Sequence, residues 1–253
     1  MVPRIYFPGQ LDSASEVVLP PEPTRYLQGV LRLRSGAEVV LFNGNGGEWT
    51  GRLQEDNRRL KVRQLVWRTG VAEPALRLTL VQGLAKAAAM EWIIQKGVEL
   101  GLSRLLPLLC ERSFSRGNAR GFDAIPERWH RIAQEAAEQC RRTRLPELAP
   151  PVTPARLGES LPPGPRLLFW EEQREQPGLR SLLSDETFAA SCRESGHLTL
   201  LVGPEGGLTA DEAHQAVETL GFVTVGLGPR ILRCETAAVS ALALVGGLWG
   251  DLA

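Results

Sequence analysis

Two segments near the carboxyl end of the chain each run from an apolar strand through a glycine-rich turn into a helix. The first pairs a predicted strand at residues 197–202 with a turn at 203–207, and the second pairs a strand at 222–227 with a turn at 228–233. Short, nearly continuous apolar runs of this kind are typical of strands in a parallel sheet covered on both faces. Two such turns side by side at the carboxyl edge of a sheet predict a pocket lined by main chain.

Local signals in the sequence predict where the helix after the first turn begins and ends. Thr209 stands three residues before Glu212, the spacing of a capping box, which predicts a helix that begins near Ala210. Gly221 occupies the position where a left-handed residue is wanted after the last helical turn. The second turn leads into an apolar, alanine-rich helix predicted over residues 236–249.

Strands and helices alternate through the rest of the chain from about residue 73. Further strands are predicted at residues 76–82, 105–110 and 166–170, and further helices at 87–100 and 126–142. This alternation predicts an α/β domain with a parallel sheet and helices on both faces. Residues 145–165 are rich in proline, which predicts a surface connection without regular structure.

Residues 1–72 have a different pattern. Short β-like runs stand at 17–19, 38–42, 48–53 and 60–67, with a glycine-rich hairpin loop at 43–47 and one helical segment near 24–31. They predict a small β-barrel. The expected organisation is therefore two domains, residues 1–72 and residues 73–253.

Charge is segregated along the chain although the formal net charge is zero. Residues 1–72 and 104–144 are net basic and residues 145–226 net acidic, and nearly all the basic residues are arginine, which binds phosphate in a bidentate manner and stacks on bases. An RNA partner is therefore the favoured interpretation, although arginine bias can also reflect genome composition. The candidate RNA contacts in the first domain are Arg4, Arg25, Arg32 and Arg34.

The four cysteines are scattered, with no metal-ligand spacing and no histidine partner, which argues against a metal and for a reducing compartment. No charged-then-apolar leader stands at the amino end, and the longest apolar stretch is too short to span a bilayer. These patterns predict a cytoplasmic protein without metal or membrane association.

Several motifs together resemble the RsmE family. They are the QKGVELG helix end at residues 95–101, the helix with Arg131, Glu135 and Glu138, the LLVGPEGG turn and the LGPRILRCETA segment. The resemblance covers nearly the whole length; one departure is Cys234, where many relatives have threonine. It implies the SPOUT class, with a C-terminal trefoil knot around the cofactor site and a PUA-like N-terminal β domain. It also implies a homodimer that uses S-adenosyl-L-methionine to methylate N3 of a uridine, uridine 1498, in 16S rRNA of the small ribosomal subunit.

The resemblance also implies a set of cofactor-binding positions. They are Leu201, Gly203, Pro204, Glu205, Gly206, Leu227, Gly228, Ile231, Leu232, Arg233, Thr236 and Ala237, with Phe169 or Trp170 at a third strand end.

The chemistry of methyl transfer to uracil suggests which residues are catalytic. N3 of uracil must lose a proton, and a guanidinium aimed at the ring oxygens would stabilise the resulting charge. Arg233 is the first choice, Arg230 the second, and Arg4 of a partner subunit a third. Glu205 or Glu235 could accept the proton if burial raised the pKa of its carboxylate, and the choice between them stays open. Glu235 could equally have only a structural role, in which its negative charge interacts favourably with the N-terminal end of the helix dipole.

Three other functions remain open at this point. The chain could be a non-catalytic RNA-binding protein, or a methyltransferase of the same class with another target nucleotide. A nucleotide-using α/β enzyme could cradle a phosphate at the first turn, although the chain lacks the lysine or ribose-binding acid expected after the first strand.

Overall fold

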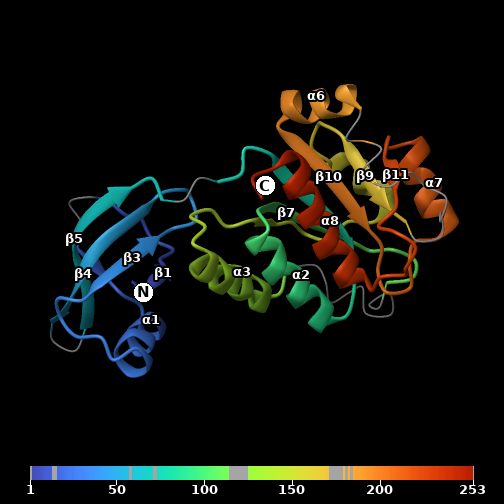
Figure 1. Cartoon of the computed structure of the whole chain (residues 1–253). Helices are drawn as coiled ribbons and strands as arrows, with labels where there is room; N and C mark the ends of the chain where they lie inside the picture. The colour runs from blue at the N-terminus through green and yellow to red at the C-terminus, as the bar shows by residue number, and fades with distance from the viewer. Residues whose placement is uncertain are drawn as a thin grey trace. The chain divides into compact units, whose positions relative to one another are not determined.

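The computed structural model describes residues 2–12, 16–56, 59–70, 73–113, 125–170, 179, 182 and 185–252. The chain divides into two compact units (Figure 1). Unit 1 comprises Met1–Glu73 together with Gln134–Leu145, and unit 2 comprises Pro74–Ala133 together with Pro146–Ala253. The expected boundary at residue 72 lies outside the described residues, and the division into domains by function stays a prediction.

Unit 1 is built on a five-stranded sheet of order β1-β3-β4-β5-β2. β1 pairs in parallel with β3, and the other pairings are antiparallel. The strands are β1 (Arg4–Tyr6), β2 (Val17–Val18), β3 (Glu38–Phe42), β4 (Glu48–Asp56) and β5 (Arg59–Arg68). Alternating residues of these strands close over an apolar cluster that includes Ile5, Leu41 and Val62. The small β domain, predicted as a barrel, is confirmed as a five-stranded sheet in which no pairing of described residues joins the edge strands β1 and β2. β1 was not predicted, because three residues are too few to show a period in the sequence.

The helical segment of unit 1 begins earlier than predicted. α1 (Pro21–Arg25) is followed at once by one turn of π-helix, Tyr26–Val30. Pro21 can start the helix because the first helical residue needs no N–H partner. Only Leu27 of the two segments is buried, so the helix shows a largely exposed surface.

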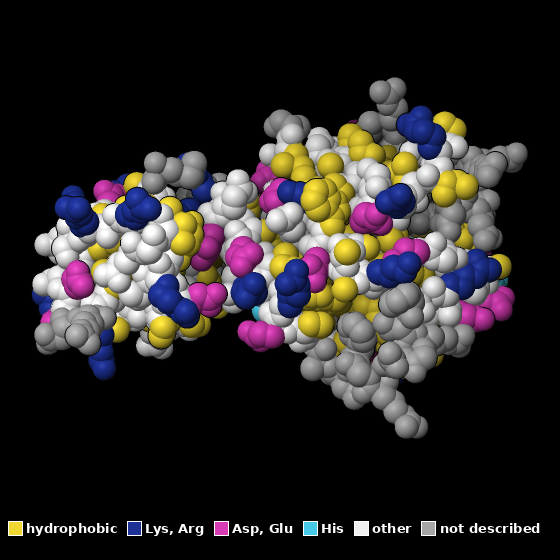
Figure 2. All heavy atoms as spheres, turned by 90° about the horizontal axis from the view of Figure 1, so that it is seen from below, with side chains coloured by type: hydrophobic (Ala, Val, Ile, Leu, Met, Phe, Trp, Pro, Cys, Tyr) yellow, Lys and Arg dark blue, Asp and Glu magenta, His cyan; other side chains and the backbone are white. Residues whose placement is uncertain are grey.

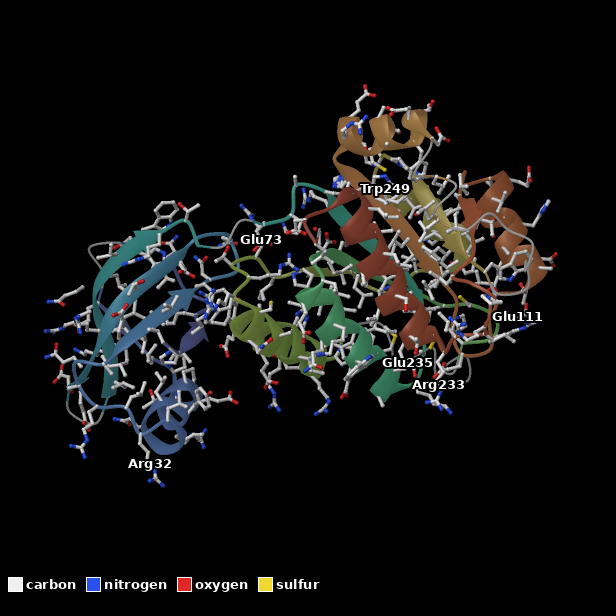
Figure 3. All side chains as sticks on the ribbon, viewed as in Figure 1. Arg32, Glu73, Glu111, Arg233, Glu235 and Trp249 are labelled. Atoms are coloured by element: carbon white, nitrogen blue, oxygen red, sulfur yellow. The ribbon has the colours of Figure 1, made fainter. Side chains whose placement is uncertain are left out.

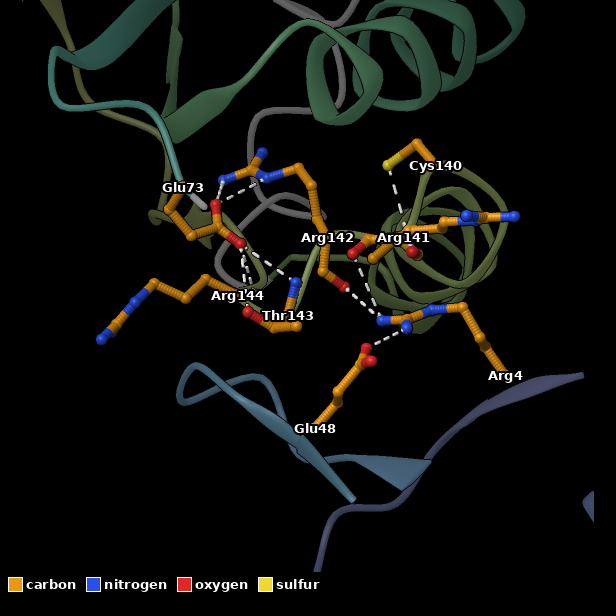
Figure 4. A network of polar contacts seen from close by, with 9 residues as sticks. Arg4, Glu48, Glu73, Cys140, Arg141, Arg142, Thr143 and Arg144 are labelled. Carbon is orange, nitrogen blue, oxygen red and sulfur yellow. Dashed lines mark hydrogen bonds and ion pairs between the residues drawn. The ribbon is translucent and has the colours of Figure 1, made fainter. Parts of the chain in front are cut away.

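Residues 134–145 join unit 1 although they are far from it in sequence. α3 (Glu127–Cys140) begins in unit 2 and ends in unit 1. Glu138 accepts a hydrogen bond from the Tyr6 N–H at 2.8 Å, and Glu73 accepts from the N–H groups of Thr143 and Arg144 at 3.0 and 2.9 Å (Figure 4). These contacts attach the end of α3 to the β domain, and no sequence pattern predicted them.

Unit 2 contains a six-stranded sheet of order β11-β9-β10-β6-β7-β8. Every neighbouring pair is parallel, which confirms the predicted parallel sheet. The strands are β6 (Arg77–Gly83), β7 (Leu102–Leu108), β8 (Glu147–Leu148), β9 (Arg166–Phe169), β10 (His197–Val202) and β11 (Val223–Val225). From β6 the chain continues to β7 on one side, and from β10 it continues to β11 on the other. The adjacent strands β6 and β10 thus form a switch point, where parallel sheets bind ligands at their carboxyl ends.

Helices pack on this sheet in two groups. α2 (Ala87–Glu99) and α8 (Cys234–Trp249) pack against each other, and α8 also packs on β6 and β10 (Figure 1). α7 (Ala210–Glu218) shares a buried cluster with α4 (Leu157–Ser160) and with strand residues of β6, β9 and β10. The sheet edge that carries the predicted turns therefore lies among α2, α7 and α8.

The local signals around α7 are confirmed. The Thr209 hydroxyl accepts from the Glu212 N–H at 3.2 Å, and the Glu212 carboxylate accepts from the Thr209 N–H at 2.9 Å. Gly221 has φ +69° after the last turn, in the left-handed region.

The prediction that residues 145–165 lack regular structure is wrong. The segment contains β8, a short 3₁₀ turn over Pro154–Arg156, and α4. Pro154 starts the 3₁₀ turn, where its missing N–H costs nothing. α6 (Glu186–Ser195) was not predicted either, and the knot stays a prediction.

Candidate active site

One pocket of about 840 Å³ lies in unit 2 at the carboxyl edge of the sheet. Its walls come from the ends of β9 and β10, the loop between β11 and α8, and the start of α2. Lining residues that the sequence predicted are Phe169, Trp170, Gly203, Pro204, Glu205, Leu227, Gly228, Arg230, Ile231, Leu232, Arg233, Glu235 and Ala237. The structure thus brings together two turns that lie about twenty-five residues apart in the chain.

The first turn lies directly against the end of β6. A Cβ atom on Gly83 would stand 2.3 Å from the Pro204 nitrogen and 2.7 Å from the Gly203 carbonyl carbon. Within the turn, the Gly207 N–H donates to the Pro204 carbonyl at 2.9 Å. Only glycine at position 83 lets the two strand ends approach so closely, and the turn rests on this contact.

Glu205 connects this turn to α2. Its carboxylate accepts a hydrogen bond from the Lys86 N–H at 2.9 Å, at a helix N-terminus that has no side-chain cap from Lys86 itself. Glu205 is exposed, so the burial that a proton-accepting role was expected to need is not found. The carboxylate has a capping role, and a role in proton transfer stays a prediction.

The start of α2 is a wall of the pocket that sequence reasoning missed. Lys86, Ala88 and Ala89 line the cavity. A signal was present, because residues 82–87 also run from a strand through a glycine into a helix. That segment lacks the second glycine and the proline of the other turns, which made it less conspicuous.

The loop between β11 and α8 carries the cationic side of the pocket. Gly228 has φ +96°, a left-handed conformation that favours glycine. Arg230 and Arg233 are exposed, and within the described residues neither guanidinium has a polar partner. Arg233 is the N-cap residue of α8, and Figure 3 shows it beside Glu235 at the start of that helix. Two positive charges are therefore available at the mouth of the cavity.

A thiol and two carboxylates stand near each other at the start of α8. The Cys234 thiol donates to Glu235 Oε2 at 3.3 Å. Burial, aided by the negative charges of Glu235 and Glu205, raises the pKa of Cys234 to about 12. The thiol is therefore neutral at physiological pH and is not a nucleophile here.

Trp170 supplies a hydrogen-bond donor without an acceptor. It lines the pocket, and its Nε1 is buried with no partner within the described part of the chain. Buried polar groups are nearly always paired in folded proteins, so an unpaired donor at a pocket wall suits a ligand acceptor.

Three predicted cofactor residues do not line the pocket: Leu201, Gly206 and Thr236. Leu201 is buried inside the sheet, with a side chain in the cluster shared with α7. A Cβ atom on Gly206 would stand 2.9 Å from Arg112 Cβ, and Arg112 Nη1 donates to the Gly206 carbonyl at 3.3 Å. The absence of a side chain at Gly206 therefore makes room for Arg112, and a contact of Gly206 with the cofactor stays a prediction.

Arg4, a predicted RNA contact, is used inside unit 1. Its guanidinium forms an ion pair with Glu48 and donates to the carbonyls of Arg141 and Arg142 at 3.3 Å each (Figure 4). It also lies over the Phe42 ring at 5.2 Å, and its side chain is 9% exposed. The expected phosphate contact at Arg4 has no support from this geometry, because the side chain is bonded to Glu48 and to the main chain just after α3.

The other predicted RNA contacts are exposed. Arg25, Arg32 and Arg34 flank the π-helical turn, where Tyr26 is 44% exposed. Arg32 has φ +52° and extends away from the helix into solvent (Figure 3). On the face drawn in Figure 2, basic side chains alternate with acidic ones and form no single basic patch. The basic and acidic segments of the sequence therefore do not form separate charged surfaces on that face.

No group of three or more His, Cys, Asp or Glu side chains among the described residues is placed to hold a metal ion. In the same part of the chain, no helix has both the length and the apolar character needed to cross a bilayer.

Comparisons with known proteins agree with this architecture. Residues 72–246 match the family described as "RNA methyltransferase domain", and residues 19–65 match "RNA methyltransferase PUA domain". A Bacillus subtilis protein named "Ribosomal RNA small subunit methyltransferase E" is 32% identical over 93% of this chain and 91% of its own. A Synechocystis protein of the same name is 35% identical, over 95% of this chain and 76% of its own.

Two solved structures are also similar over the whole length. A ribosomal RNA small subunit methyltransferase E from Neisseria gonorrhoeae, bound to S-adenosyl methionine, gives a TM-score of 0.84 at 32% identity and full coverage of both chains. A methyltransferase from Legionella pneumophila in complex with the same cofactor gives 0.81 at 29% identity, again with full coverage of both.

Proposed function

Because the chain belongs to the RNA methyltransferase family and also contains an RNA methyltransferase PUA domain, we propose that it methylates N3 of a uridine in 16S rRNA with S-adenosyl-L-methionine as methyl donor. The observation that carries the proposal is the pocket formed by the two converging turns. The relatives' names support the small-subunit rRNA as the substrate. The N3 position and uridine 1498 follow from the family resemblance.

The pocket suits this cofactor. Its volume lies within the range usual for small-molecule sites, and its walls combine main chain with apolar side chains such as Val202, Val225 and Leu227. Gly203 and Gly228 leave main-chain groups open to a ligand, and Trp170 Nε1 is a buried donor without a partner among the described residues. Main-chain groups of the two turns would hold the adenine and the amino-acid part, with apolar residues at the faces of the ring. When bound, the sulfonium supplies an activated methyl group.

The protein's own task is then to position the acceptor and to stabilise its charge. Holding the uracil nitrogen in line and excluding water is the main part of such catalysis. Loss of the N3 proton leaves negative charge on the ring oxygens. Arg233 is the residue we propose to face those oxygens, since its guanidinium is exposed at the pocket and free of polar partners among the described residues. Arg230 is the second candidate on the same loop.

The proton acceptor is Glu235 or Glu205. Glu235 is half-buried and lines the pocket at the start of α8. Glu205 is exposed and already accepts from Lys86. We favour Glu235 on this ground, because its carboxylate has no backbone N–H to cap among the described residues.

RNA contact by unit 1 is the second part of the proposal. Arg25, Arg32 and Arg34 are exposed around a π-helical turn with Tyr26 beside them. Guanidinium groups can contact phosphate while an exposed aromatic ring stacks on an unpaired base. This segment is therefore the proposed RNA-contacting element of the β domain, in a protein expected to act in the cytoplasm.

A homodimer is the proposed assembly. α8 packs on α2, β6 and β10 of its own subunit and still leaves Leu244 47% exposed, with Leu252 46% exposed just beyond the helix. A second copy could cover these apolar side chains. Light scattering after size exclusion tests the proposal, and a monomer at micromolar concentration would reject it.

Product analysis tests the reaction. Small ribosomal subunits and naked 16S rRNA that lack the modification are incubated with the protein and S-adenosyl-L-methionine, digested to nucleosides and analysed by mass spectrometry. We expect N3-methyluridine. A different methylated nucleoside would support the same class with another target, and no methylation of either substrate would support a non-catalytic RNA-binding protein.

A further inference from the structure

Gln82 is a fully buried polar residue at the carboxyl end of β6. Its side-chain Nε2 donates to two carbonyl oxygens, those of Gly83 and Gly203, each at 3.0 Å. Both partners are acceptors only, so the amide nitrogen must face them and the orientation of the carboxamide is determined.

One of these two acceptors belongs to the pocket. Gly203 is the first residue of the turn after β10 and lines the cavity. Val202, which pairs in register with Gln82, lines it as well. Side chains of paired residues in neighbouring strands lie on the same face of a sheet, so the Gln82 side chain stands on the face where the pocket begins, without lining the cavity.

The other end of the Gln82 side chain is unpaired. Its Oε1 is buried and has no hydrogen-bond partner within the described residues. An unpaired buried acceptor lowers stability, and a leucine or methionine of similar size would avoid this cost. An apolar residue would, however, also leave the carbonyls of Gly83 and Gly203 without the bonds from Nε2. What the glutamine adds at this position is therefore a polar contact to the first residue of the turn.

We propose that Gln82 is a positioning residue for the pocket. It fixes the Gly203 carbonyl, and with it the main chain of residues 202–205, in the conformation that receives the cofactor. Gly83 and Pro204 form the steric part of the same support, since they approach too closely to allow a Cβ atom between them. The inference rests on the proposed function for the identity of the ligand, but not for the conformation of the turn.

The test replaces Gln82 by methionine, which keeps the length of the side chain and removes both polar groups. Gln82→Leu is a second variant in case methionine packs poorly. Leu80→Met is the matched control, because Leu80 is fully buried two residues earlier on the same face of β6 and pairs in register with Leu200, inside β10.

Three measurements are made on the full chain: thermal unfolding without ligand, calorimetric titration with S-adenosylhomocysteine, and hydrogen exchange at the Gly207 amide, which is bonded to Pro204 within the turn. For Gln82→Met we expect only a modest change of Tm, because the loss of two hydrogen bonds is partly offset by removal of the unpaired Oε1, together with at least tenfold weaker binding and at least tenfold faster exchange at Gly207. The control is expected to change neither binding nor exchange.

Two results would overturn the inference. Unchanged binding and exchange in a folded Gln82→Met protein would remove the positioning role. A large loss of Tm, with binding weakened and exchange accelerated only in proportion to the lost stability, would assign Gln82 to general stability. If the wild type itself failed to bind S-adenosylhomocysteine, the proposed function would fail, and the exchange measurement would still decide the role of Gln82.

Discussion

The Glu205 carboxylate accepts a hydrogen bond from the Lys86 N–H, although 119 positions separate the two residues in the chain. The turn after β10 thus caps the helix that follows β6, and this contact joins two walls of the pocket. The start of α8, where Figure 3 shows Arg233 and Glu235, lines the same pocket.

This contact predicts different effects for two substitutions of Glu205. Glu205→Ala is expected to weaken S-adenosylhomocysteine binding about fivefold. Loss of a helix cap costs about 1 kcal/mol, and the start of α2, which would lose its cap, is a wall of the pocket. Glu205→Gln keeps an acceptor oxygen and is expected to retain most of the affinity and the kcat. If the glutamine variant bound normally but lost its kcat, Glu205 would be the proton acceptor instead.

Arg233→Ala is expected to lower kcat on the order of 100-fold and to change cofactor affinity little. The reason is that a guanidinium facing the uracil oxygens acts on charge that develops during the reaction. Single-turnover methylation and calorimetry measure the two quantities separately.

Arg230→Ala is the matched control, because Arg230 is exposed on the same loop. Its expected effect on kcat is smaller. A larger loss in Arg230→Ala than in Arg233→Ala would reverse the two assignments.

Arg32→Ala combined with Arg34→Ala is expected to weaken RNA binding and to reduce the slope of log affinity against log salt by about 2, because each arginine that neutralises a phosphate adds about 1 to that slope. Both side chains are exposed, so stability is expected to change little. Titration with 16S rRNA fragments at several salt concentrations measures the slope, and an unchanged slope would remove this segment from the RNA footprint.

Arg4→Ala provides the contrast. It leaves the largely buried Glu48 carboxylate without its ion-pair partner, which is expected to cost roughly 3 kcal/mol of unfolding free energy. The salt slope of RNA binding is expected to stay as in the wild type, and a reduced slope in a protein of normal stability would restore Arg4 as a phosphate contact.

Glu138 makes stability depend on pH. Burial raises the pKa of its carboxyl above the ordinary value, against the lowering effect of the Tyr6 N–H bond. At pH values between the ordinary pKa of the unfolded state and the raised pKa of the folded state, the folded protein holds a proton that the unfolded chain has released. The contribution of Glu138 to stability therefore falls as pH rises through this range.

Glu138→Gln keeps an acceptor for Tyr6 and removes the ionisation. The variant is expected to be as stable as the wild type at acidic pH and more stable at neutral pH, as urea denaturation at several pH values would measure. A variant that was equally destabilised at all pH values would contradict this account.

Local signals in the sequence predicted much of unit 2. The Thr209 and Glu212 spacing predicted the start of α7 because a capping box involves only four consecutive residues. β10 was predicted at its observed bounds because a strand buried on both faces is a nearly continuous apolar run. Both turns of the pocket were predicted for the same reason, since strand, glycine and helix follow one another directly in the chain.

Contacts between distant residues were not predicted. The wall at the start of α2 depends on the bond from Lys86 to Glu205, and the role of Gly206 depends on Arg112. The internal use of Arg4 depends on residues at the end of α3 that join unit 1 only in space. No pattern of neighbouring residues carries such information, so an arginine with a buried partner looks in the sequence like one on the surface.

Calorimetric titration of the wild-type protein with S-adenosylhomocysteine, and separately with a nucleoside triphosphate, tests the central claim most directly. The account predicts saturable binding of S-adenosylhomocysteine, which Gly228→Val abolishes in a folded protein, and no binding of the triphosphate. Binding of the triphosphate alone would contradict it.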